Sequence, residues 1–262
     1  MAKAVEIPVY LFTGFLEGGK TRFIRETLED KKFNAGEHTL LVLCEEGEEE
    51  YDLSHPLMKN VHILPIESEE ELTAEKLGEW QKIHRVDRVV IEYNGMWLLQ
   101  RLYEQMPQGW MIYQEVMLAD YNTFLSYNTN MRSLMVDKLT SCEMVLLNRA
   151  PVGADKMEIH RVIRGVSRRT DIGYDYVDGS FDYDEIEDPL PFDINAPVIE
   201  IGDNDFAVWY RDLTEEMEKY QGKTVRFKGR VVTKHRSLKN CFVCGRHVMT
   251  CCVEDITFMG LA

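Results

Sequence analysis

The sequence predicts an α/β protein whose main part is a doubly wound, mostly parallel sheet, followed by a small β-rich C-terminal module. Three observations support this fold class. Short apolar runs rich in β-branched residues alternate with helical stretches through the first 180 residues, as in parallel sheets covered by helices on both faces. A glycine-rich turn directly follows the first of these runs. After residue 197 the pattern changes to short strand-like segments with a single helix.

Each expected element follows from hydrophobic periodicity and from the turn residues that bound it. We expect buried strands at 5–12, 38–44, 61–66, 87–93, 111–119 and 143–147, and an edge strand at 174–177. We expect helices at 22–28, 69–84, 96–106, 124–140 and 155–168. In the C-terminal part we expect strands at 198–201, 224–233 and 246–253 and a helix at 209–220.

The segment between these two parts is acidic, contains prolines and shows no clear periodicity. It therefore predicts a linker or a draped loop. We accordingly divide the chain into a main domain at 1–180, an acidic linker at 181–197 and a β-rich, cysteine-containing module at 198–262.

The composition restricts the partners and the compartment. A formal net charge of −15 over 262 residues disfavours a nucleic-acid backbone or an anionic membrane surface as the main partner. No apolar run approaches the roughly 20 residues that span a membrane, and the first residues do not form a signal peptide. We therefore expect a cytoplasmic protein that does not span a membrane. Its six cysteines are expected to be thiols, metal ligands or core residues rather than a disulfide framework.

The turn after the first strand carries the clearest chemical signal in the chain. Residues 14–21 fit the pattern G-x-x-x-x-G-K-[ST], in which glycines let successive backbone N–H groups point at a phosphate. Lys20 can reach the β- and γ-phosphates, and the Thr21 hydroxyl can ligate Mg²⁺. The helix that follows would direct its positive N-terminal end at the same phosphates. The sequence thus predicts a nucleotide phosphate site whose residues are Gly14, Glu17, Gly18, Gly19, Lys20, Thr21 and Arg22.

Two acidic residues at strand ends are candidates to complete this site. Glu92 lies near the end of the strand expected at 87–93, where a carboxylate can hold Mg²⁺ or orient the attacking water. Gly95 follows closely, and its N–H is placed to meet a γ-phosphate. Glu45 begins an acidic run after the strand at 38–44, on the side where doubly wound sheets bind their ligands. Most of that run is expected to be a solvated loop, but one or two carboxylates could serve Mg²⁺ or respond to the γ-phosphate.

Five short motifs, taken in order, resemble those of the CobW-type P-loop GTPases, a group associated with metal delivery to enzymes and cofactors. They are FTGFLEGGKT at 12–21, CEEGE at 44–48, IEYNG at 91–95, LAD at 118–120 and LLN at 146–148. The resemblance implies a P-loop NTPase domain that binds GTP with Mg²⁺ and hydrolyses it slowly, coupled to a conformational switch. It implies catalytic roles for Lys20, Glu92 and Glu45, Mg²⁺ ligation by Thr21 and Glu92, and nucleotide contacts by Gly95 and Asn148.

Two departures limit what the resemblance implies. The family recognises guanine with N-K-x-D, whereas this chain has Asn148-Arg149-Ala150-Pro151, and Pro151 has no carboxylate to accept from the guanine N1 and N2 donors. GTP is therefore favoured by the resemblance alone, and ATP stays open. The family's C-x-C-C metal motif is also missing. Cys44 stands alone in that region and is expected to be a core residue.

The C-terminal module gathers cysteines and a histidine within a dozen residues. Thiolate and imidazole ligands suit Zn²⁺ better than Mg²⁺ or Ca²⁺, and the spacing matches no usual iron–sulfur pattern. The alternative is a small β-barrel core partly filled by free cysteines. If zinc binds, strand alternation favours as its ligands Cys241, Cys244, His247 and Cys251, with Cys252 facing the interior.

The same module resembles the C-terminal domain of a family of permease subunits. The shared positions are Tyr220, Gly222, Lys223, Val225 and Gly229, followed by Arg246, Cys251, Cys252 and Asp255. What this resemblance implies is a partial OB-like barrel, since the chain ends before such a barrel would normally close.

These observations lead to one preferred hypothesis and two alternatives. The preferred hypothesis is Mg²⁺-dependent binding and slow hydrolysis of a nucleoside triphosphate by a CobW-like switch that handles a metal or delivers it to a metalloprotein client. The first alternative is a degenerate nucleotide-binding adaptor that docks a partner such as a membrane permease, without significant catalysis. The second is an OB-type nucleic-acid binder, which the acidic charge disfavours. The sequence leaves the oligomeric state open.

Overall fold

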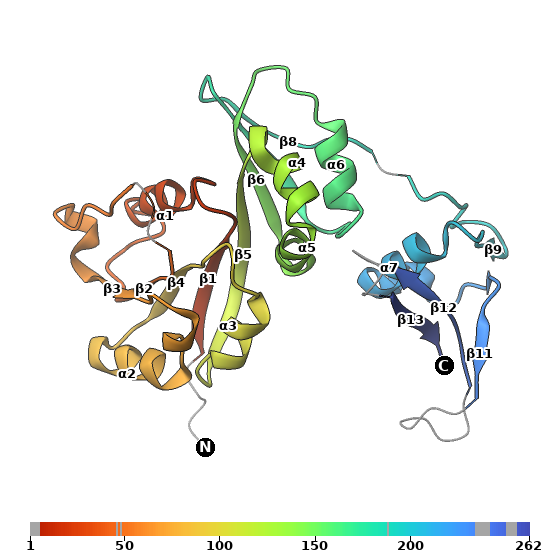
Figure 1. Cartoon of the computed structure of the whole chain (residues 1–262), viewed down its shortest axis with the longest axis horizontal. Coiled ribbons are helices and arrows are strands. Elements are labelled where there is room, and N and C mark those ends of the chain that lie inside the picture. Colours follow the sequence, from red (N-terminus) through yellow and green to blue (C-terminus); the bar gives the residue numbers. More distant parts are fainter. Residues whose placement is uncertain (1–5, 46, 48, 188, 234–241, 250–255) are drawn as a thin grey trace. The chain divides into compact units, whose positions relative to one another are not determined.

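The chain divides into two compact units, Met1–Asp184 and Glu185–Ala262, which are described here one at a time (Figure 1). The computed structural model describes residues 6–45, 47, 49–187, 189–233, 242–249 and 256–262. No helix within these residues is long and apolar enough to cross a membrane.

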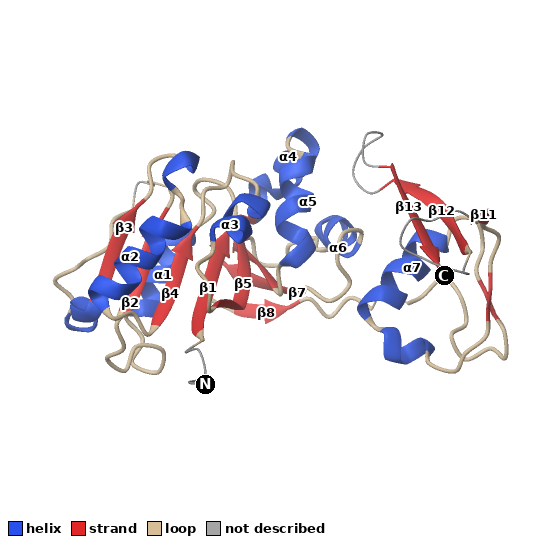
Figure 2. Ribbon diagram, turned by 90° about the horizontal axis from the view of Figure 1, so that it is seen from below, coloured by secondary structure: helices blue, strands red, loops and turns tan. Residues whose placement is uncertain are grey.

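The first unit is built on one eight-stranded sheet in the order β3-β2-β4-β1-β5-β6-β7-β8, and Figure 2 shows its strands β4, β1 and β5 side by side. Its strands are β1 (Ile7–Thr13), β2 (Thr39–Leu43), β3 (Val61–Pro65), β4 (Arg88–Glu92), β5 (Trp110–Asp120), β6 (Met144–Ala150), β7 (Asp171–Tyr176) and β8 (Phe181–Tyr183). Every neighbouring pair is parallel except β7 and β8. Since β1 lies between β4 and β5, the loops after β1 and β4 meet at one edge of the sheet.

Helices cover both faces of this sheet, which confirms the predicted fold class. They are α1 (Lys20–Leu28), α2 (Ala74–His84), α3 (Leu99–Gln105), α4 (Tyr121–Asn130), α5 (Arg132–Ser141) and α6 (Met157–Arg164), with 3₁₀ turns at Pro56–Asn60 and Glu69–Glu71. Ile24 and Leu28 of α1 pack on one face of the sheet. The buried side chains of α2 to α6 pack on the opposite face, in two adjoining apolar clusters.

Several predicted boundaries change in the first unit. The helix expected at 124–140 is two helices, because Met131 leaves the helical conformation with φ −132° and ψ 44°. The helix expected at 69–84 begins only at Ala74, since Thr73 caps it by accepting a hydrogen bond from the Lys76 N–H at 3.2 Å.

The strand expected at 174–177 is present as β7, but it does not form the edge of the sheet, because a further strand follows it. Gly179 turns the chain with φ +83°, and Asp178 Oδ1 accepts a hydrogen bond from the Ser180 N–H at 2.9 Å. This tight turn returns β8 antiparallel to β7. The stretch predicted as a linker from residue 181 therefore begins with a strand of the main sheet.

The second unit combines one helix with two small sheets. Its elements are β9 (Ile199–Glu200), α7 (Phe206–Glu215), a 3₁₀ turn at Met217–Tyr220, β10 (Val225–Arg226), β11 (Arg230–Val232), β12 (Val243–Met249) and β13 (Ile256–Leu261). β9 pairs with β10 in parallel, and β11, β12 and β13 form an antiparallel sheet. Trp209 is fully buried beside Phe206 and Phe227 and anchors the core of this unit. The small β-rich module is thus confirmed.

Candidate functional site

The loop between β1 and α1 is shaped by glycines that no larger residue could replace. Gly14 and Gly19 have φ of +123° and +88°, a region that L-residues with side chains rarely adopt. A Cβ on Gly14 would lie 2.0 Å from the Leu118 carbonyl oxygen, and one on Gly18 would lie 2.8 Å from the same atom. The loop therefore sits directly against the backbone of β5, and its shape is fixed by contact.

Lys20 is the first residue of α1, and its side chain turns back into this loop. Its Nζ donates to the carbonyl oxygens of Gly14 and Phe15, both at 2.8 Å, and to Glu45 Oε2 at 2.6 Å. The Lys20 side chain is only 3% exposed and that of Glu45 10%. The ammonium group is thus held at the centre of the loop by two carbonyls and one carboxylate.

The loop after β4 meets the β1–α1 loop at Gly95. A Cβ on Gly95 would lie 2.7 Å from the Gly14 carbonyl oxygen and 2.7 Å from Phe15 Cα, so only glycine permits this approach. The Gly95 N–H donates to Glu45 Oε1 at 3.4 Å. The two oxygens of Glu45 therefore bridge the ammonium of Lys20 and the N–H of Gly95.

Glu92 lies beside the start of α1 and is 2% exposed. Its Oε1 accepts from Thr21 Oγ1 at 2.7 Å, and its Oε2 accepts from the Tyr51 hydroxyl at 2.5 Å. Burial raises the pKa of Glu92 above its ordinary value, against the opposing effect of these hydrogen bonds and of the Lys20 charge. Tyr51 lies after the acidic run and was not among the predicted site residues. Its hydroxyl pKa is raised, first by burial and then by the charge of Glu92.

Asn148 and Arg149, at the end of β6, hold the opposite side of the loop. Asn148 Nδ2 donates to the Gly18 carbonyl, while its Oδ1 is buried and has no hydrogen-bond partner among the described residues. Arg149 Nε donates to Asp120 Oδ2 at 2.6 Å, and its Nη2 donates to the Glu17 carbonyl. Neither Arg149 nor Asp120 was a predicted site residue, although Asp120 ends the LAD motif at 118–120 and Arg149 directly follows the LLN motif at 146–148.

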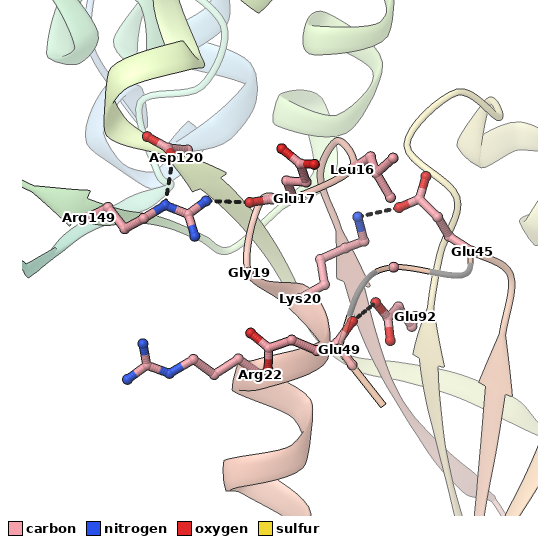
Figure 3. Close-up of a pocket in the computed structure, with 12 residues that line it drawn as sticks. Leu16, Glu17, Gly19, Lys20, Arg22, Glu45, Glu49, Glu92, Asp120 and Arg149 are labelled. Carbon is pink, nitrogen blue, oxygen red and sulfur yellow. Dashed lines mark hydrogen bonds and ion pairs between the residues drawn. The ribbon is translucent and has the colours of Figure 1, made fainter. Parts of the chain in front are cut away.

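These groups line a cavity of about 680 Å³ (Figure 3). The lining residues are Leu16, Glu17, Gly19, Lys20, Thr21, Arg22, Glu45, Gly47, Glu49, Glu92, Asp120 and Arg149. Figure 3 shows Lys20 facing Glu45, and Arg149 facing Glu17 and Asp120. A smaller cavity of about 110 Å³ also contains Gly19, Arg22, Glu49 and Arg149, and adds Asn148 and Asp175 to its lining.

The predicted phosphate-site residues are therefore brought together. Seven of them line the larger cavity, namely Glu17, Gly19, Lys20, Thr21, Arg22, Glu45 and Glu92. The other four contact its walls: Gly14, Gly18 and Gly95 through their close backbone approaches, and Asn148 through its side-chain amide.

Of the four predicted zinc ligands, the structure describes only Cys244 and His247. Cys241 and Cys251, like Cys252, lie outside the described residues. Cys244 and His247 both belong to β12 but are three residues apart, so strand alternation directs them to opposite faces. Whether this pair ligates one ion with the predicted cysteines stays a prediction. Within the described ranges no three His, Cys, Asp or Glu side chains are arranged to hold a metal ion, and zinc binding stays a prediction.

Cys44 is 3% exposed and packs in the core cluster beneath α2 and α3. Burial raises the pKa of its thiol. Both facts fit a core residue rather than a metal ligand.

Comparison with protein-family models matches residues 181–262 to the DUF1980 C-terminal domain. The match spans the whole second unit and supports a distinct C-terminal module. Among curated proteins, the pre-mRNA-splicing factor SYF1 of Debaryomyces hansenii is 30% identical over 95 residues, which is 34% of this chain. The chain spans only 11% of the length of that relative.

Two solved structures have a similar arrangement. The Zn(II)-bound YjiA GTPase from E. coli is 21% identical with a TM-score of 0.47, over 64% of this chain and 57% of that chain. The hydrogenase maturation factor HypB from Archaeoglobus fulgidus is 14% identical with a TM-score of 0.45, over 66% of this chain and 82% of that chain. These scores are too low to carry an argument about function, and the fold assignment rests on strand order and loop geometry.

Proposed function

We propose that the first unit binds a nucleoside triphosphate with Mg²⁺ and hydrolyses it slowly, as a CobW-like switch in metal handling or delivery. The observation that carries this proposal is the position of Lys20, whose ammonium is held inside a glycine loop that opens on a cavity of about 680 Å³. A point charge among inward-facing backbone groups at a helix N-terminus is the arrangement that binds chained phosphates.

The metal side of the site is supported by the paired oxygens of Thr21 and Glu92, 2.7 Å apart. A hydroxyl and a buried carboxylate are hard oxygen donors, which is the ligand chemistry that Mg²⁺ prefers. Thr21 and Glu92 would hold Mg²⁺, and a bound Mg²⁺ neutralises negative charge on the β- and γ-phosphates. Thr21 would have to redirect its hydroxyl from Glu92 toward the ion.

Slow turnover is expected because the arginines of the main cavity are already engaged. Arg22 Nε donates to Glu26 at 2.9 Å, and Arg149 is held by Asp120 and Glu17. Both guanidinium groups are therefore paired with acceptors of the chain, and none of these contacts directs either group toward a γ-phosphate. Hydrolysis without a supplied arginine should proceed on the order of 10⁻⁴ to 10⁻² per second.

The choice of base is expected to be weak. Asn148 stands where the CobW-type resemblance puts base recognition, but Pro151 supplies no acid for the guanine donors. GTP is therefore preferred by resemblance, and ATP is a second substrate. A client metalloprotein and zinc in the second unit belong to the same proposal and rest on the motif resemblance and on the cysteines of the sequence.

The alternative is a nucleotide-binding adaptor that docks a partner such as a permease without significant catalysis. It is favoured by one observation, namely that the Lys20 ammonium already forms an ion pair with the Glu45 carboxylate. Single-turnover release of phosphate from GTP and ATP, measured with Mg²⁺ and with EDTA, separates the two functions. The proposal predicts slow, Mg²⁺-dependent release. Bound triphosphate that stays intact over many hours would favour the adaptor.

A further inference from the structure

The carboxylate of Glu45 contacts two donors that the sequence predicts to serve phosphate groups. Its Oε2 accepts from Lys20 Nζ at 2.6 Å, and its Oε1 faces the Gly95 N–H at 3.4 Å. Lys20 is expected to reach the β- and γ-phosphates, and the Gly95 N–H is expected to meet the γ-phosphate. A carboxylate that bridges them presents two anionic oxygens in place of phosphate oxygens.

The segment that carries Glu45 is held at both ends. Before it, the Cys44 N–H donates to the Glu92 carbonyl at 2.9 Å, and Asn94 Nδ2 donates to the Cys44 carbonyl at 3.2 Å. After it, Glu49 pairs with Arg25 at 3.2 Å, and Tyr51 donates to the Glu92 carboxylate. The contact of Glu45 with Lys20 is thus flanked on both sides by further contacts, those of Cys44 before it and those of Glu49 and Tyr51 after it.

We propose that Glu45 is a specificity-determining residue that discriminates triphosphate from diphosphate. This inference rests on the proposed nucleotide site. The β-phosphate of a diphosphate shares Lys20 with Glu45 but leaves the Gly95 N–H to the Glu45 carboxylate. A triphosphate brings a second anion to the same two donors, and because like charges in contact repel strongly, it must displace the Glu45 carboxylate.

Displacement of Glu45 has a consequence for the metal side of the site. Glu45 and Tyr51 lie on the same loop. The Tyr51 hydroxyl donates a hydrogen bond to Oε2 of Glu92 at 2.5 Å. Movement of the loop would withdraw this hydroxyl and free the Glu92 oxygen. Entry of the γ-phosphate is thereby linked to exposure of a metal ligand.

The test compares binding of GDP and of a non-hydrolysable β,γ-imido GTP analogue, both with Mg²⁺, to the full-length chain and to Glu45→Gln. Removing the charge while keeping the shape should raise affinity for the triphosphate analogue by about tenfold or more, and change GDP affinity by less than about threefold. Glu50→Gln removes the same charge from an exposed position on the same loop and should change neither affinity. Glu45→Ala, a second variant that also removes the charge, should shift the ratio in the same direction.

The outcomes separate this inference from the proposed function. An unchanged or lower ratio of triphosphate to diphosphate affinity in both folded Glu45 variants would overturn the role of Glu45, even if both nucleotides bind. Failure of the folded wild type and of the variants to bind either nucleotide would overturn the proposed function and the inference together.

Discussion

Replacement of Glu92 by glutamine separates the role of this residue in folding from its role in chemistry. The carboxylate accepts from Thr21 at 2.7 Å and from Tyr51 at 2.5 Å. A glutamine of the same shape keeps one acceptor oxygen but presents an NH₂ group to the other hydroxyl. Each hydrogen bond to a charged group contributes about 1.5–3 kcal/mol to the free energy of unfolding. Glu92→Gln would therefore lower stability strongly if the charge of Glu92 stabilised the folded state.

The raised pKa of Glu92 shows that the charge is not favourable on balance. Burial is the largest effect on this group and outweighs the two hydrogen bonds and the Lys20 charge. We therefore expect Glu92→Gln to change the free energy of unfolding by no more than about 1 kcal/mol near neutral pH, since neutral replacements of buried charges often cost little.

The pH dependence has a defined sign. A carboxyl group with a raised pKa in the folded state stabilises the fold in its protonated form. That contribution is present below the ordinary carboxyl range and is lost as the pH rises through the raised pKa. Glutamine does not titrate, so the stability of Glu92→Gln relative to the wild type should increase over this pH interval.

Turnover should respond much more than stability. Without the carboxylate, the site loses a metal ligand or the group that orients water, and phosphate release should fall by about 10²-fold. Binding of the triphosphate should stay within a few fold, because Lys20 and the loop remain. Stopped-flow or single-turnover phosphate release and equilibrium binding with a fluorescent GTP analogue measure the two quantities.

Glu115→Gln is the matched control for this experiment. Glu115 is 3% exposed, compared with 2% for Glu92, has a pKa raised first by burial, and accepts from two hydroxyls, those of Tyr103 and Ser141, both at 3.0 Å. It lies outside the residues that line the cavity. Its replacement should leave turnover unchanged. Equal turnover in Glu92→Gln and wild type, or an equal loss in both variants, would refute the catalytic assignment of Glu92.

Three further predictions follow from the same geometry. Competition binding should show less than about hundredfold preference for GTP over ATP; a preference of several thousandfold would contradict the argument from Pro151 and would direct attention to Asp175, which lines the smaller cavity together with Glu26 and Glu49. Gly95→Ala should lower stability by about 1–3 kcal/mol in urea unfolding and weaken triphosphate binding, because its Cβ would lie 2.7 Å from the Gly14 carbonyl oxygen. Elemental analysis of untagged protein should find zinc in the wild type and less in Cys244→Ser; wild type that carries none and binds none on addition would show that these cysteines are not ligands.

The phosphate loop could be predicted because its signal is local. The glycines, Lys20 and Thr21 are adjacent in sequence, and the strand before and helix after them follow from short-range patterns. Glu92 could be placed because parallel strands bring their carboxyl ends to one edge of the sheet. The pairing of Thr21 with Glu92 is the result of that topology.

The contact of Tyr51 with Glu92 and the pairing of Lys20 with Glu45 could not be predicted from local sequence patterns. Both depend on the path of the loop after β2, which is acidic and carries no periodic pattern, so propensities do not determine its course. Arg149 was missed for a different reason. Its positive φ of +54° directs the side chain back to Glu17 and Asp120, and a backbone conformation of that kind has no sequence signature in an arginine.

The turn at Gly179 was, by contrast, a signal present in the sequence. Asp178-Gly179-Ser180 is a strong turn pattern between two aromatic strands, but the second of these strands was assigned to the acidic linker at 181–197 because many acidic residues follow it. Strand β13 was missed because residues 256–262 have weak alternation and two small residues near the end.

Equilibrium binding of a fluorescent triphosphate with Mg²⁺ to the wild type and to Lys20→Ala tests the central claim most directly. Lys32→Ala, which removes an exposed lysine of the same unit, is the control. The account predicts saturable binding to the wild type and to Lys32→Ala, and loss of binding in a folded Lys20→Ala protein, since Lys20 supplies the point charge at the centre of the loop. Unchanged affinity in folded Lys20→Ala, or no binding to the wild type, would contradict it.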